Sequence, residues 1–109
     1  MSYTIKTLNK ISPKGLSKFG EGYVLDDNAA NPDAILVRSA SLHEVEFPES
    51  LLSIARAGAG VNNIPIDKCA EKGIVVFNTP GANANAVKEL AIAAMLISSR
   101  KIVDGINWA

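Results

Sequence analysis

The chain has 109 residues, which is enough for one domain with a buried core and too few for two such domains. Its 11 basic and 11 acidic residues balance, so net charge favours neither nucleic acid nor an anionic membrane surface as a partner. The single cysteine, Cys69, excludes an internal disulfide framework, is typical of a cytoplasmic protein and is expected to be a small buried side chain.

Five short runs of β-prone residues recur along the chain, separated by turn and helix signals. The first alternates apolar and polar residues, as a half-buried strand does. The third, AILVR, is apolar on both faces, which is typical of a central strand in a parallel sheet. In chain order, we expect strands at residues 3–8, 23–25, 34–38, 53–57 and 74–77.

Helical segments alternate with these strands. Ser12 followed by Pro13 is typical of a helix start, and Gly73 is typical of a helix end. In chain order, we expect helices at residues 12–19, 47–52, 66–72 and 83–103, the last being one long helix that is apolar nearly all round. This alternation predicts an α/β fold with a parallel sheet and helices on both of its faces.

No segment is typical of a membrane protein. The N-terminus lacks the apolar region of a signal peptide, and the longest apolar stretch, residues 91–97, is far too short to cross a bilayer. We therefore expect a cytoplasmic protein that has no membrane partner.

Three of the predicted strands end in segments rich in polar residues or glycine: RSAS, RAGAG and NTPG. The carboxyl ends of parallel strands meet at one edge of a sheet, where ligands bind. Arg38 and Arg56, together with the backbone N–H groups of a glycine-rich loop, suit an anionic ligand. The alternative is that both arginines are solvent-exposed residues beside ordinary turns.

The segment RAGAGVNN contains two glycines one residue apart, as a dinucleotide-binding loop does. Such a loop needs a third glycine three positions after the second, so that its helix can pack closely on the strand. Counting from Gly58 and Gly60, that position is Asn63. The segment is therefore not predicted to be a cofactor fingerprint.

The chain contains ILVRSAS, then RAGAGVNNIPID, then GIVVFNTPGANANAVKELAIAAMLISSRKI, which together span about two thirds of its length. In this order, the motifs resemble the phosphoglycerate-specific members of the D-isomer-specific 2-hydroxyacid dehydrogenase family. One departure is Asn62, where the family usually has aspartate. The only histidine, His43, lies in a loop and not in the family's catalytic-histidine motif, so we expect it to be a surface or partly packed residue.

The resemblance implies a fold of two flavodoxin-like or Rossmann-like halves, one binding substrate and the other NAD, with the active site between them. It implies that residues 1–82 are the N-terminal part of the substrate-binding domain. Residues 83–109 are then the long C-terminal interdomain helix, truncated before the NAD-binding domain of the same chain. The family's catalytic arginine, glutamate and histidine come from segments beyond residue 109, so neither catalytic nor metal-binding residues are expected here.

The resemblance also implies roles for individual residues. Ala59 and Gly60 would hold the substrate carboxylate through their backbone N–H groups, and Ala59 would also contact NAD. Arg38 and Arg56 would pair with the phosphate of the substrate. Asn83 would add a side-chain contact, or would serve only as the N-cap of the long helix.

The implied activity is the NAD-dependent oxidation of a phosphorylated 2-hydroxyacid, 3-phospho-D-glycerate, to 3-phosphohydroxypyruvate, the first step toward serine. The enzyme would be a homo-oligomer, and this chain alone would be inactive. Another D-2-hydroxyacid is the near alternative as substrate. A different class is a stand-alone receiver-like module, suggested by Asp26 and Asp27 after a strand, although Arg38 and Asn78 follow the strands that would need an aspartate and a lysine.

Overall fold

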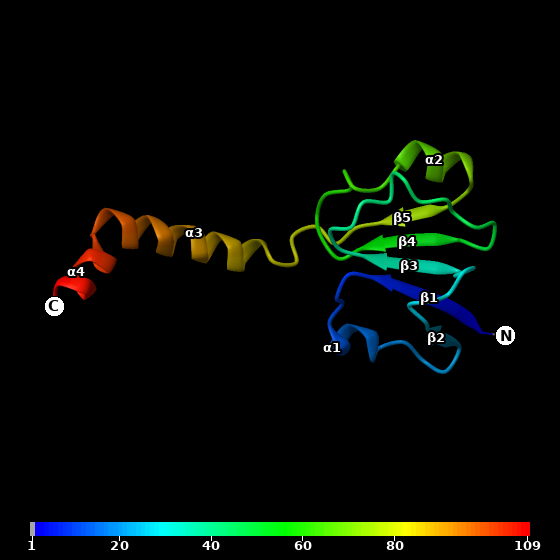
Figure 1. Ribbon diagram of the computed structural model, residues 1–109, viewed down its shortest axis with the longest axis horizontal. Coiled ribbons are helices and arrows are strands. Elements are labelled where there is room, and N and C mark those ends of the chain that lie inside the picture. The colour runs from blue at the N-terminus through cyan, green and yellow to red at the C-terminus, as the bar shows by residue number, and fades with distance from the viewer. Residues whose placement is uncertain (1) are drawn as a thin grey trace.

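The computed structural model describes residues 2–109. Its strands form one fully parallel five-stranded sheet in the order β2-β1-β3-β4-β5 (Figure 1). The strands are β1 (Tyr3–Leu8), β2 (Tyr23–Leu25), β3 (Ala34–Val37), β4 (Ser53–Arg56) and β5 (Val75–Phe77). This is the strand order of a flavodoxin-like doubly wound sheet, so the predicted fold class is confirmed. All five predicted strands are present, with ends that differ from the prediction by at most one residue.

The helices are α1 (Pro13–Leu16), α2 (Ile66–Glu71), α3 (Ala84–Ser99) and α4 (Ile102–Trp108). The predicted starts of α1 and α2 and the predicted end of α2 agree with the structure, but α1 ends at Leu16 and not at residue 19 as predicted. Pro13 lies at the first position of α1, and Gly73 has a φ of 73°, the left-handed conformation that ends a helix. None of these helices, within residues 2–109, is long and apolar enough to span a bilayer.

Two helix predictions are wrong. Residues 47–52 form a turn, closed by the bond from the Leu51 N–H to the Pro48 carbonyl (3.1 Å), and not a helix. The Leu52 N–H donates to the carbonyl of Asp33, the residue just before β3 (2.8 Å). The chain is therefore extended there, and a second helical turn has no room.

The predicted long helix also breaks, at Lys101, whose φ of 51° is left-handed. The break follows Ser98 and Ser99, which are weaker helix formers than the residues before them. The Ser99 hydroxyl donates to the carbonyl of Leu96 (3.3 Å) at the point where the last turn tightens. The C-terminal segment is therefore two helices, α3 and α4.

The core lies on one face of the sheet, between the strands, α2 and the connections that follow β3 and β4. Cys69 is buried there, as predicted. The cluster consists of Ile35, Val37, Leu42, Phe47, Leu51, Ile54, Ile64, Cys69 and Ile74.

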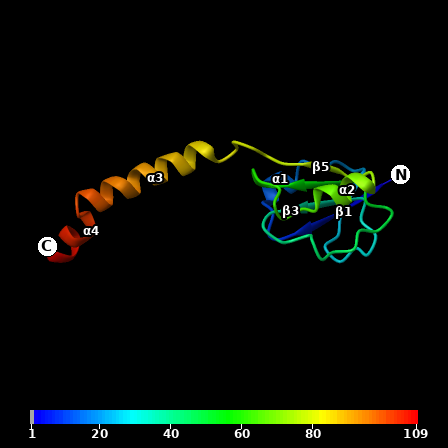
Figure 2. The same ribbon diagram turned by 90° about the horizontal axis from the view of Figure 1, so that it is seen from above.

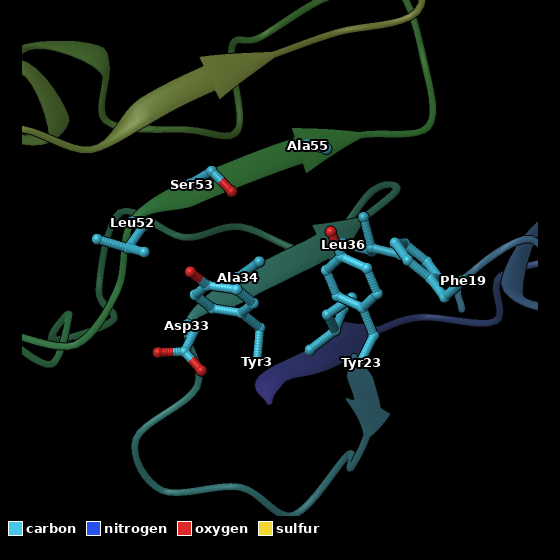
Figure 3. A pocket seen from close by; sticks show the side chains of 10 residues that line it. Tyr3, Phe19, Tyr23, Asp33, Ala34, Leu36, Leu52, Ser53 and Ala55 are labelled. Carbon is cyan, nitrogen blue, oxygen red and sulfur yellow. The ribbon is translucent and has the colours of Figure 1, made fainter. Parts of the chain in front are cut away.

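The opposite face, here called the open face, is covered only near β1 and β2. The rings of Tyr3, Phe19 and Tyr23 cluster there, with centroids 6.1 Å apart for Tyr3 and Tyr23 and 5.4 Å apart for Phe19 and Tyr23. They line a depression of about 360 Å³ together with small and apolar side chains of β3 and β4 (Figure 3). Helices on both faces were predicted, but α2 covers the core face and only the short α1 segment approaches the open face.

Helices α3 and α4 extend beyond the carboxyl edge of the sheet, clear of both of its faces (Figures 1 and 2). They contact each other and none of the strands. The molecule consequently measures 63 × 32 × 21 Å. Large apolar side chains of the two helices are solvent-exposed, among them Leu90 (74% exposed) and Trp108 (91% exposed).

Candidate functional site

The three polar or glycine-rich strand ends lie together, as predicted. The register pairs Val37 with Arg56 and Ala55 with Phe77, so the segments after β3, β4 and β5 emerge side by side. They form one edge of the sheet, on the side from which α3 leaves (Figure 1). We call this edge the carboxyl rim and define it as residues 38–41, 56–60 and 78–81.

The glycines of the middle loop make room for the side chain of Arg56. Its Nη1 donates to the carbonyl of Gly60 (2.6 Å) and to Oδ1 of Asn62 (3.1 Å), so the guanidinium lies against its own loop. A Cβ on Gly58 would lie 3.1 Å from Arg56 Nε, and a Cβ on Gly60 would lie 3.3 Å from Arg56 Nη1. A side chain at either glycine would therefore crowd the guanidinium of Arg56, which gives the two glycines a role that is independent of a dinucleotide fingerprint.

The carbonyl groups of residues 58–60 are engaged within the protein. That of Gly58 accepts from the Thr79 N–H (2.9 Å), that of Ala59 from Asn78 Nδ2 (2.6 Å), and that of Gly60 from Arg56. The N–H groups of residues 58–60 donate to no protein acceptor in the part of the chain that the structure describes. A loop with paired carbonyls and unpaired N–H groups is suited to an anion.

The two rim arginines have different surroundings. Arg56 is half-buried and tied to its loop, and its Nε is buried without a hydrogen-bond partner among residues 2–109. Arg38 is exposed, and its guanidinium has neither a hydrogen-bond nor an ion-pair partner over the same residues. Arg38 is therefore the cation at the rim that remains available to a ligand.

Two asparagines that were not predicted to be site residues hold the segment after β3. Oδ1 of Asn9 accepts from the backbone N–H groups of Arg38, Ser39 and Ala40. From the other side, Nδ2 of Asn63 donates to the carbonyls of Arg38 (3.2 Å) and Ala40 (2.8 Å). The sequence signals are slight, namely an asparagine directly after a predicted strand and a second one beyond a glycine loop.

Asn83 is not brought into contact with the other predicted residues. It is the N-cap of α3, with φ −115° and ψ 10°, but its side chain makes no capping hydrogen bond. Asn83 thus occupies the N-cap position without capping the helix by its side chain, and its predicted ligand contact stays a prediction.

The remaining titratable candidates have structural surroundings. His43 lies in an exposed loop, as predicted, with Nε2 2.7 Å from the carbonyl of Asn62. The carboxylate of Asp27 accepts from the N–H and the hydroxyl of Thr7, and these hydrogen bonds lower the pKa of Asp27. Across residues 2–109, no three His, Cys, Asp or Glu side chains lie close enough together to hold a metal ion.

The strand order and the rim define a doubly wound α/β domain whose carboxyl edge carries N–H groups and an exposed guanidinium of the kind that suits an anion. The sequence profile described as "D-isomer specific 2-hydroxyacid dehydrogenase, catalytic domain" matches residues 17–106. The chain belongs to the D-isomer specific 2-hydroxyacid dehydrogenase family.

Individual relatives agree with this assignment. The chain is 48% identical over 73 residues to a hydroxypyruvate reductase of Thermotoga maritima. The aligned region covers 64% of this chain and 24% of the relative. It is 45% identical over 73 residues to a D-3-phosphoglycerate dehydrogenase of Archaeoglobus fulgidus, covering 64% of this chain and 14% of the relative. The chain thus spans a quarter or less of the length of these curated relatives.

A solved structure supports the fold. The crystal structure of NAD+-bound 3-phosphoglycerate dehydrogenase from Entamoeba histolytica superposes with a TM-score of 0.70 at 30% identity. The match covers 89% of this chain and 39% of that one.

Proposed function

We propose that this chain forms the substrate-binding part of an NAD-dependent D-2-hydroxyacid dehydrogenase that oxidises 3-phospho-D-glycerate to 3-phosphohydroxypyruvate. The observation that carries the proposal is the rim itself. The unpaired N–H groups of residues 58–60 follow β4, and the exposed guanidinium of Arg38, which has no partner among residues 2–109, follows the adjacent strand β3. Such an arrangement suits a ligand with two anionic groups, a carboxylate and a phosphate. Oxidation of this substrate is the first step toward serine.

Each rim group has a role in this proposal. The N–H groups of Ala59 and Gly60 bind the substrate carboxylate, and the guanidinium of Arg38 binds the phosphate. Arg56 holds the loop in the shape that presents those N–H groups, because its Nη1 fixes the Gly60 carbonyl. This differs from the prediction that both arginines bind phosphate.

NAD would supply the hydride acceptor. The exposed loop around Ala59 fits an edge contact with the nicotinamide, but the sequence has no G-x-G-x-x-G run to hold the pyrophosphate. This chain's part is therefore to bind and orient the substrate. We propose that residues 1–82 do so and that residues 83–109 lead toward the NAD-binding half of the enzyme, with α3 projecting from the rim.

A second candidate substrate is an unphosphorylated 2-hydroxyacid. It is favoured by the relative in Thermotoga maritima, whose name is hydroxypyruvate reductase. D-Glycerate is the matched test compound, because it differs from 3-phospho-D-glycerate only by the phosphate.

The test is a titration of the ¹⁵N-labelled protein with each compound, followed by NMR. Both should shift the amide signals of Ala59 and Gly60, and only the phosphorylated compound should shift that of Arg38. A charge-assisted hydrogen bond is worth about 1.5–3 kcal/mol, so 3-phospho-D-glycerate should bind about ten- to a hundredfold more tightly. Equal affinities would favour the unphosphorylated substrate, and unmoved signals at the loop would contradict the proposal.

The isolated chain should also have no dehydrogenase activity, because it supplies neither the loop that binds the pyrophosphate of NAD nor a catalytic acid or base. The measurement is NADH absorbance after the protein is mixed with NAD and 3-phospho-D-glycerate. Enzymatic NADH production by the pure chain would refute this division of roles.

A further inference from the structure

Asn9 occupies a special position in the sheet. It directly follows β1, whose last residue, Leu8, pairs with Val37 at the end of β3. The connection from β1 runs to β2 on one side of the sheet, and β3 lies on the other side, so the chain order reverses at this point. In open parallel sheets, this switch point is where ligands bind.

The side chain of Asn9 spans the switch point. Its Oδ1 lies 3.1 Å from the N–H nitrogen of Arg38, 2.9 Å from that of Ser39 and 3.0 Å from that of Ala40. Three consecutive N–H groups thus converge on one amide oxygen. Asn9 reaches them from a left-handed backbone conformation, with φ 73°, which asparagine tolerates better than most residues.

The backbone N–H groups of residues 38–40 donate to Asn9 and not to a neighbouring strand. The last bond between β3 and β4 is donated by the Ala57 N–H to the Val37 carbonyl (2.8 Å), so regular pairing ends before Arg38. The carbonyls of Arg38 and Ala40 accept from the buried Asn63, which is 9% exposed. Two side chains therefore clamp residues 38–40, Asn9 by the N–H groups and Asn63 by the carbonyls.

We infer that Asn9 is a positioning residue for the phosphate of the substrate. By fixing the backbone of residues 38–40, it presents the guanidinium of Arg38 to the ligand, whereas the carboxylate site at residues 59 and 60 does not depend on it. The inference rests on the proposed function, because it assigns Arg38 to the phosphate. Fixing the backbone beforehand lowers the cost of ordering it when the ligand binds.

The test compares two variants that share the backbone preference of Asn9 and differ in the oxygen. Asn9→Gly tolerates a positive φ but removes the acceptor, and Asn9→Asp keeps an acceptor oxygen at the same position. Amide hydrogen exchange at residues 38–40 reports the clamp, and dissociation constants for 3-phospho-D-glycerate and D-glycerate report the site. If Asn9→Gly fails to fold by circular dichroism, Asn9→Ser replaces it, because its shorter side chain cannot reach all three N–H groups.

In Asn9→Gly, we expect exchange at residues 38–40 to accelerate and phosphoglycerate binding to weaken, each about tenfold, with D-glycerate binding unchanged. Asn9→Asp should keep the slow exchange of the wild type at residues 38–40, because its carboxylate still accepts from these N–H groups; since it also adds a negative charge, it is the control for the exchange measurement alone. Unchanged exchange in Asn9→Gly would overturn the inference, as would equal weakening of both ligands. A wild-type protein that binds neither ligand would contradict the proposed function instead, and the exchange rates would still decide whether Asn9 holds the segment.

Discussion

Arg38 directly follows β3 and Arg56 is the last residue of β4. The two look equivalent in the sequence, but their side chains lie in different surroundings. The first has no partner in the described part of the chain, and the second donates to the loop that it underlies. We therefore expect Arg38→Ala to weaken 3-phospho-D-glycerate binding about ten- to a hundredfold and to leave D-glycerate binding unchanged. Calorimetric titration measures both. Arg38→Lys should recover part of the loss, because lysine keeps the charge and lacks the planar fork.

Arg56→Ala is the matched control for that prediction. Removing Arg56 frees the carbonyl of Gly60 and Oδ1 of Asn62, so the loop loses its support and both ligands should weaken by similar factors. A selective loss of phosphoglycerate binding would instead place Arg56 at the phosphate, in agreement with the expectation from sequence.

Gly58 and Arg56 should be energetically coupled. A methyl group at residue 58 would lie 3.1 Å from Arg56 Nε, so Gly58→Ala should lower the free energy of unfolding by about 1–3 kcal/mol. In the Arg56→Ala background the crowding side chain is absent, so Gly58→Ala should lower the free energy of unfolding by less than about 0.5 kcal/mol. Urea unfolding of the wild type, the two single variants and the double variant measures the coupling as a double-mutant cycle. Additive effects would show that Gly58 is needed for a reason other than Arg56.

At the scale of elements, the end of α2 gives a separate test of backbone conformation. Gly73 has φ 73°, and no atom lies within 4 Å of the position its Cβ would take. The cost of Gly73→Ala is therefore conformational, about 1–2 kcal/mol of unfolding free energy. Gly15→Ala in α1 is the control, since Gly15 has the same open space without a positive φ, and it should stabilise slightly. Equal thermal stabilities for the two variants would contradict this account.

The elements that could be predicted from sequence are those with local signals. Strand periodicity, Pro13 at a helix start and Gly73 at a helix end depend on neighbouring residues and are confirmed. The missing helix over residues 47–52 depends on a backbone bond between Leu52 and Asp33, nearly twenty residues apart, which no local pattern reveals.

The same distinction separates the parts of the site. The rim loops carry glycine and arginine at fixed spacing, so their meeting at one edge followed from the parallel sheet. The clamp by Asn9 joins residues about thirty positions apart, and an asparagine after a strand has many possible partners. The contact of Arg56 with its own loop depends on where its side chain turns, which spacing does not determine.

At the scale of the whole molecule, α3 should make the protein self-associate. Its apolar side chains, including Leu96 (57% exposed) and Ile97 (42% exposed), contact no strand. Burying such a side chain contributes about 1.5–3 kcal/mol, which favours packing of a second molecule against the exposed side chains of α3. Sedimentation velocity over a concentration series should reveal a dimer or larger species, weakened by Leu96→Gln and Ile97→Gln together. Lys88→Gln is the control on the same helix, and a monomer at every concentration would contradict the prediction.

The projection of α3 and α4 has an optical consequence. The only tryptophan, Trp108, lies near the far end of the 63 Å molecule, whereas both tyrosines, Tyr3 and Tyr23, lie on the open face of the sheet. Excitation energy passes from tyrosine to tryptophan only over short separations. When α3 and α4 project from the sheet, excitation of the tyrosines should give tyrosine fluorescence. If the helices close over the open face, within one molecule or between two, tryptophan emission should rise, so the unmodified protein carries its own reporter of where its helices lie.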